Sequence, residues 1–124
     1  MKVKKVTKGP FTIAVNETDP IVLSVTIGNA QIGGNVVRIG NKQIAKGEIH
    51  DLLLGSGAEL IGEALTIITN VLDVNPASNK ISITHFFFNG TPPVFSYPFP
   101  GEDMEVDDNG DVLSLTATYT FIKK

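Results

Sequence analysis

Residues 64–90 constrain the fold most, because two segments rich in strand-forming residues flank a cluster of turn residues. Residues 64–74 are dominated by β-branched and aliphatic side chains, which suit a pleated sheet and lower helix propensity. Residues 75–79 contain Pro76, which fixes one backbone dihedral, and Asn and Ser side chains that bond to nearby backbone. Residues 80–88 then resume the strand pattern. We therefore expect a β-hairpin, with the rest of the fold built outward from it.

Alternating apolar and polar residues predict further strands. Residues 21–28 alternate most regularly, and in residues 111–122 one face carries Leu113, Leu115, Ala117, Tyr119 and Phe121. A second hairpin is expected around Gly40 and Asn41. The Asn109-Gly110 pair predicts a third tight hairpin, with residues 104–107 and 111–122 as its arms.

Residues 28–62 complete the expected elements. Residues 28–35, with two adjacent glycines, are expected to form a loop. Three adjacent leucines at positions 52–54 have no regular period and are expected to plug one open end of the β structure. At most one short helical turn is expected near residues 56–62, because Ser56 can cap it and Glu59 can complete a capping box.

Seven or eight strands separated by turn signals predict an all-β fold, an antiparallel β-sandwich of immunoglobulin-like or jelly-roll-like architecture. A closed up-and-down β-barrel is the alternative. Residues 1–10, where Val3 and Val6 alternate with lysines, are expected to be a flexible arm or an edge strand protected by charge. Residues 11–124 then form a single domain, since a chain of 124 residues supports one core.

Charge and cysteine usage narrow the function classes. The net charge is −3 and Arg38 is the only arginine, which argues against a nucleic-acid partner. Lysines gather at both ends of the chain, where we expect solvated termini, with contact to an acidic partner or an anionic surface as the alternative. The chain has no cysteine, so it can form neither disulfides nor a thiolate metal site, and we expect no cofactor.

The location of the protein is predicted from its apolar segments. No segment resembles a signal peptide or approaches the ~18 apolar residues of a membrane span. The chain as written is therefore expected to be soluble and cytoplasmic. A leader trimmed from it would instead mean a secreted protein.

Residues 102–111 place six carboxylates in one short run. Asp107, Asn109 and Asp111, at alternate positions, resemble the opening of an EF-hand loop and are the candidate metal ligands. The pattern then departs from the EF-hand, because Val112 stands where the glycine belongs and Thr118 where a bidentate Glu is needed. A looser calcium site that shares Asp73 or Asn75 is one hypothesis. A charged edge hairpin that repels other sheet edges is the other.

Six of the nine aromatic residues lie within residues 86–99. Alternation puts His85 and Phe87 on one face of the predicted strand, so Phe86 and Phe88 project from the other. They are either covered by a second layer or form an exposed apolar patch that marks an interface. The Pro-rich residues 94–98 are expected to form an edge strand or extended loop that folds over the patch as a lid. The interface candidates are Phe86, Phe88, Phe95, Tyr97 and Phe99.

These observations favour a non-catalytic binding or assembly module that uses its edge strands and the aromatic patch, with another protein or a second copy as partner. The alternative is a carrier of a small apolar ligand inside the sandwich or barrel, with the leucines at 52–54 and the aromatic segment at its mouth. A calcium-dependent binding module is a weaker alternative. An enzyme is not expected, because no paired acid and base can be located around His50, His85 or Ser56.

Overall fold

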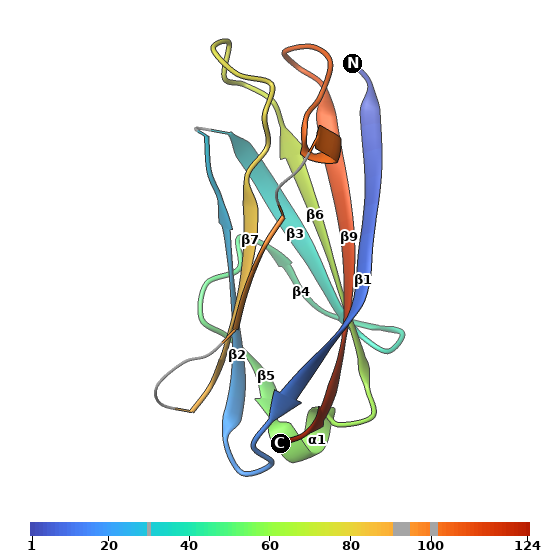
Figure 1. Cartoon of the computed structure of the whole chain (residues 1–124), viewed down its shortest axis with the longest axis vertical. Coiled ribbons are helices and arrows are strands. Elements are labelled where there is room, and N and C mark those ends of the chain that lie inside the picture. The colour runs from blue at the N-terminus through green and yellow to red at the C-terminus, as the bar shows by residue number, and fades with distance from the viewer. Residues whose placement is uncertain (30, 91–94, 100–101) are drawn as a thin grey trace.

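The computed structural model describes residues 1–29, 31–90, 95–99 and 102–124, which form two β-sheets (Figure 1). In order across the five-stranded sheet, the strands are β1 (Val3–Val15), β9 (Val112–Lys123), β6 (Ala64–Leu72), β3 (Ile32–Ile39) and β4 (Lys42–Gly47). The four-stranded sheet has the order β5 (Leu52–Ser56), β2 (Pro20–Ile27), β7 (Ile83–Asn89) and β8 (Phe95–Pro98). One helix, α1 (Gly57–Leu60), and one 3-10 turn, η1 (Glu102–Met104), complete the described elements.

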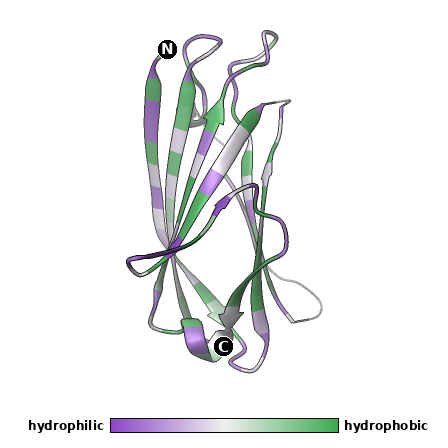
Figure 2. Cartoon of the chain, turned by 180° about the vertical axis from the view of Figure 1, so that it is seen from behind, coloured by the Kyte–Doolittle hydropathy of each residue, from purple (hydrophilic) through white to green (hydrophobic). Residues whose placement is uncertain are grey.

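The predicted all-β fold is confirmed, and neither sheet closes on itself in the described residues. The two sheets share one core: the ring of Tyr119 on β9 lies 4.7 Å from that of Phe87 on β7, edge to face. Hydropathy alternates along the strands in bands, as expected where one face is buried (Figure 2). The residues predicted to face inward on β9 are all buried: Leu113, Leu115, Ala117, Tyr119 and Phe121.

The prediction of a hairpin at residues 64–88 is wrong. Strand β6 pairs with β3 and β9, whereas β7 pairs with β2 and β8 in the other sheet. The chain does fold back between the two strands, but it crosses the sandwich as it does so (Figure 1). Turn residues fix a reversal, and they do not fix whether the next strand pairs with the previous one or faces it.

The prediction of a tight hairpin around Asn109 and Gly110 is also wrong. Met104 ends η1, and Glu105 forms an isolated bridge with Lys80 rather than a ladder with β9. The partners of β9 are instead β6 and, in parallel, β1. The acidic run is therefore not an edge hairpin.

Other local predictions have mixed outcomes. The β3–β4 hairpin around Gly40 and Asn41 is confirmed, and so is the capping box in which Ser56 and Glu59 each bond the other's backbone N–H. The leucines at 52–54 do not plug an end, because they form the edge strand β5. The expected loop at 28–35 ends early, since β3 begins at Ile32. Strand β8 lies at a sheet edge as predicted, and position 94, the first residue of that predicted segment, lies outside the described residues.

Strand β1 forms one edge of the five-stranded sheet and is its only parallel member among the described strands. It pairs with β9 from Val3 opposite Val112 to Val15 opposite Lys123, with a register shift between Lys8 and Phe11. The first and last strands of the chain therefore lie side by side, and the boundary expected at residue 10 falls inside one strand.

Candidate functional site

An apolar row crosses the outer surface of the four-stranded sheet. Phe88 on β7 pairs with Val22 on β2, and Val22 pairs with Leu53 on β5. Phe86 lies two residues from Phe88 and points the same way, because Phe87 between them is buried in the core. Leu53 is 62% exposed, and the other three side chains are half-buried. We call Val22, Leu53, Phe86 and Phe88 the outer aromatic face.

The other three aromatic candidates point into the sandwich. Tyr97 lies 5.0 Å from Phe11 and 5.5 Å from Tyr119, measured between ring centroids. Phe99 is buried, with its ring 5.0 Å from that of His85, and Phe95 packs against the same core. The predicted lid is therefore wrong, because β8 extends the sheet beside Phe86 and turns its aromatic side chains inward.

A chain of buried hydrogen bonds joins the sheets around His85. The Asn35 amide donates to Gly47 O at 3.1 Å, so its Oδ1 accepts from Thr69 Oγ1 at 2.7 Å. The hydroxyl proton of Thr69 is donated to Asn35, so Thr69 Oγ1 can only accept from His85, whose Nε2 donates to it at 3.1 Å. The other ring nitrogen, Nδ1, then accepts from Tyr119 Oη at 2.8 Å. Burial lowers the pKa of His85 to about 3, which keeps the ring neutral.

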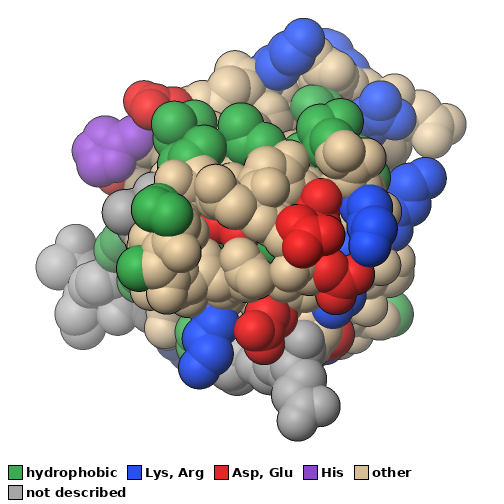
Figure 3. All heavy atoms as spheres, turned by 90° about the horizontal axis from the view of Figure 1, so that it is seen from above, with side chains coloured by type: hydrophobic (Ala, Val, Ile, Leu, Met, Phe, Trp, Pro, Cys, Tyr) green, Lys and Arg blue, Asp and Glu red, His purple; other side chains and the backbone are tan. Residues whose placement is uncertain are grey.

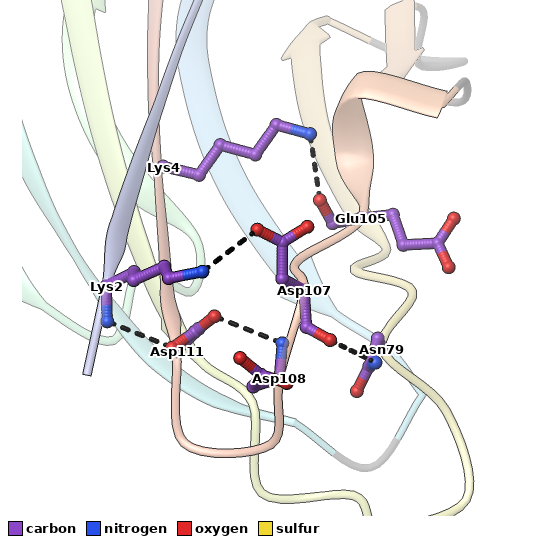
Figure 4. A network of polar contacts seen from close by, with 7 residues as sticks. All are labelled: Lys2, Lys4, Asn79, Glu105, Asp107, Asp108 and Asp111. Carbon is purple, nitrogen blue, oxygen red and sulfur yellow. Dashed lines mark hydrogen bonds and ion pairs between the residues drawn. The ribbon is translucent and has the colours of Figure 1, made fainter.

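Three lysines, Lys2 just before β1 and Lys4 and Lys8 on it, contact the acidic segment. Figure 4 shows Lys2 Nζ reaching Asp107 Oδ2 at 3.5 Å and Lys4 Nζ donating to the Glu105 carbonyl oxygen at 2.8 Å. Lys8 Nζ contacts Asp103 Oδ2 and lowers the pKa of that carboxyl. We call these three pairs the lysine clasp. Lys2 and Lys4 are solvent-exposed, as expected for this end of the chain, but they also contact the acidic segment, and Figure 3 shows lysine and carboxylate side chains together.

The candidate metal ligands meet hydrogen-bond donors rather than one another. Asp111 Oδ1 accepts from Lys2 N at 2.9 Å and Oδ2 from Asp108 N at 3.1 Å, and the first of these bonds contributes most to lowering the pKa of Asp111. Asp107 faces Lys2, and Asn109 is exposed. In the described part of the chain, no group of three or more His, Cys, Asp or Glu residues is arranged to hold a metal ion.

Asp73, which the sequence offered as a further ligand of a calcium site, is buried. Its Oδ1 accepts from Gln31 Nε2 at 2.7 Å and from Asn75 N at 3.3 Å, and its Oδ2 has no hydrogen-bond partner among the described residues. The side-chain amide of Asn75 donates to Asn29 O. Asp73 and Asn75 thus serve the loop that joins the two sheets.

A cleft of about 490 Å³ opens where β2 and β3 diverge. Four aliphatic side chains line it, and so do polar or charged ones: Val25, Ile27, Ile32 and Ile49, with Gln31, Asn35, Glu48 and His50. Neither the leucines at 52–54 nor the aromatic segment lines it, so it is not the mouth that the sequence suggested for a ligand.

No protein-family model, curated protein or solved structure matches the chain. Across the residues with described coordinates, no helix has the length and apolar character needed to cross a bilayer. The function must therefore be inferred from the surfaces of this molecule.

Proposed function

We propose that the chain is a non-catalytic β-sandwich module that assembles with another protein or with a second copy of itself through its edge strands and the outer aromatic face. The observation that carries the proposal is the continuous apolar row formed by Leu53, which is 62% exposed, and the half-buried Val22 and Phe88. A row of apolar side chains across a sheet gains free energy when a partner removes it from water, at about 25 cal/mol per Å².

The sheet edges support the same proposal. Strand β5, which carries Leu53, lies at the edge of the four-stranded sheet beside this row. An edge strand offers backbone groups that an extended segment of a partner can pair with, and an adjoining apolar surface adds energy to that contact.

Substitution of Phe88 tests the proposal. We expect the wild-type chain to elute as a dimer or larger species in size-exclusion chromatography with light scattering. Phe88→Asp places a charge in the row and should give a monomer with an unchanged circular-dichroism spectrum. Thr84→Asp is the matched control, because it adds the same charge to the same side of β7 away from Leu53 and Val22.

A second variant guards against misfolding. If Phe88→Asp unfolds, Leu53→Asp makes the same test at a side chain that is already 62% exposed. A wild-type chain that stays monomeric up to millimolar concentration contradicts self-assembly. Assembly that survives both substitutions contradicts the role of this face.

The cleft favours a second candidate function, a carrier of a small apolar ligand. Its volume of about 490 Å³ is within the range of small-molecule sites, and its lining combines aliphatic side chains with the polar Gln31 and Asn35. A ligand that binds only the folded chain raises the melting temperature as its concentration rises. A screen of small apolar compounds by thermal shift, repeated with Ile27→Lys to block the cleft, tests this candidate.

A further inference from the structure

The first half of β1 is held to the molecule by few apolar contacts. Among residues 1–10, Val6 is the only buried side chain. It pairs with Leu115 on β9, so the side chains that alternate with it on the inward face are Lys2, Lys4 and Lys8. A hollow of about 340 Å³, lined in part by Lys2, Lys4 and Val106, lies between this half of the strand and the acidic segment.

The lysine clasp holds this half of β1 by charge and hydrogen bonds. Its pairs run in opposite directions along the two segments, with Lys2 at Asp107, Lys4 at Glu105 and Lys8 at Asp103. The side chains of the Lys2–Asp107 pair are 68% and 79% exposed. Exposed pairs contribute little to stability and weaken as salt screens them. The Lys2–Asp107 pair therefore adds little stability, and the Lys8–Asp103 pair, whose side chains are 31% and 44% exposed, is the better shielded of the two. The order of the pairs favours a strand with lysines at these positions.

The second half of β1 is anchored differently. Ile13 and Val15 are each 1% exposed, and both lie in the core. Between the halves, the register shifts after Lys8, and Gly9 has φ of +92°. A Cβ at Gly9 would lie 2.6 Å from the Thr118 carbonyl oxygen, so only glycine fits this junction. The outer half can detach while Ile13 and Val15 stay in place.

We propose that residues 3–8 form an exchangeable strand, which in a pair of copies lies on β9 of the partner instead of on its own. Residues 112–117 of β9 keep their pairing with β6, but detachment leaves the backbone groups on their other side unpaired, beside the carboxylates of Asp103 and Asp107. An extended strand with lysines at alternate positions can pair with these backbone groups and with the carboxylates. Residues 3–8 of a second copy are such a strand, with their lysines in the same register. This inference extends the proposed assembly role, and it uses a different surface from the outer aromatic face.

Two single-cysteine chains test the exchange. Thr7 and Thr116 are Cα partners in the β1–β9 ladder, and both side chains point away from the core. The chain has no cysteine of its own, so the only thiols in a mixture of Thr7→Cys and Thr116→Cys chains are at these two positions. A disulfide between them, in excess of what random collision gives, reports that strand 3–8 of one chain lies on β9 of the other. Oxidised glutathione serves as the oxidant and takes up the two electrons released by the thiols.

We expect mass spectrometry of the oxidised mixture to find a peptide that links position 7 of one chain to position 116 of the other. The yield of this peptide should rise with protein concentration. The link should also form faster at about 1 M NaCl, because the Debye length falls to about 3 Å there and the screened lysine clasp releases the strand more often. Thr7→Cys mixed with Ser96→Cys, an exposed position on β8, measures random collision. A Thr7→Cys chain that also carries Lys2→Glu, Lys4→Glu and Lys8→Glu should lose the link if the lysine clasp selects the strand.

The outcomes separate this inference from the proposed function. A 7–116 link between chains that persists in the Phe88→Asp background supports exchange even if the outer aromatic face does not assemble. A link no more abundant than the Thr7→Cys and Ser96→Cys control, at every concentration and salt tested, overturns exchange and leaves the outer aromatic face to its own test. The double variant Thr7→Cys/Thr116→Cys, oxidised as a monomer, shows that both positions are adjacent in the folded chain.

Discussion

His85 is fully buried, yet both of its ring nitrogens have hydrogen-bond partners. Because Thr69 donates to Asn35, His85 carries its ring proton on Nε2, and Tyr119 donates to Nδ1. Since both nitrogens are satisfied by the neutral ring, the chain gains a polar link between its two sheets without burying a charge. Protonation would add a donor at Nδ1, where the Tyr119 hydroxyl already donates.

The neutral state of His85 predicts a loss of stability in acid. The unfolded chain binds a proton at His85 near pH 6.5, and the folded chain only near pH 3, so unfolding takes up a proton between these values. The free energy of unfolding therefore falls as the pH falls, by up to about 1.4 kcal/mol per pH unit and by about 2 kcal/mol at pH 5 from this residue alone. Urea unfolding at pH 7 and pH 5 measures it.

Two variants isolate that contribution. His85→Phe removes the titrating group, so its free energy of unfolding should be lower at pH 7 but should fall less between pH 7 and pH 5. His50→Gln is the control, because the His50 side chain is 87% exposed. Equal pH slopes for wild type and His85→Phe would show that other groups account for the acid sensitivity.

For single residues, the sequence correctly predicted which face of a strand a side chain lies on, but not which residues of other strands it contacts. Period-two alternation correctly placed His85 and Phe87 on the buried side of β7, and Phe86 and Phe88 on the other. It contains no information on which residue of another strand meets His85, since Asn35, Thr69 and Tyr119 come from three other strands. The direction of Phe95 and Tyr97 was missed for a related reason, because it depends on the register with β7.

At the scale of elements, strands were easier to predict than their pairing. Residues 75–79 reverse the chain whether the next strand pairs with β6 or crosses to the opposite sheet, so turn chemistry alone does not separate a hairpin from a crossing. Two glycines in β3 were assigned to a loop for a similar reason. Gly33 is needed in a strand because the backbone of a neighbouring strand lies close to it, which only the folded structure reveals.

Gly33 and its neighbour Gly34 form a matched pair for testing this packing. A Cβ at Gly33 would lie 2.3 Å from the Asn70 carbonyl oxygen and 2.7 Å from Ile27 Cδ1, whereas at Gly34 the nearest atom is 3.9 Å away. Gly33→Ala should therefore lower the free energy of unfolding by about 1–3 kcal/mol, as overpacking against backbone does. Gly34→Ala should change it little. Urea midpoints for both variants decide, and equal effects would contradict the close approach.

At the scale of the whole molecule, the first and last strands join the chain's two ends. Val3 pairs with Val112 and Val15 with Lys123, so β1 is added to the sheet through contacts between residues more than a hundred positions apart. Such contacts close long loops, so they cost more chain entropy than contacts between neighbouring strands and form slowly. The two halves of β1 then differ in what keeps them there, since one has the core residues Ile13 and Val15 and the other has the lysine clasp.

This difference predicts an uneven distribution of opening free energy, which amide hydrogen exchange measures. Amides of residues 3–8 should exchange through local opening, far faster than those of β6 and β7, which have neighbours on both sides. Raising NaCl from about 0.1 M to about 1 M shortens the Debye length from about 10 Å to about 3 Å and weakens the lysine clasp, so it should speed exchange at 3–8. Residues 11–15 are the internal control, because Ile13 and Val15 are held by the core. Uniform protection along β1, unchanged by salt, would mean that the backbone ladder with β9 and Val6 alone hold the strand.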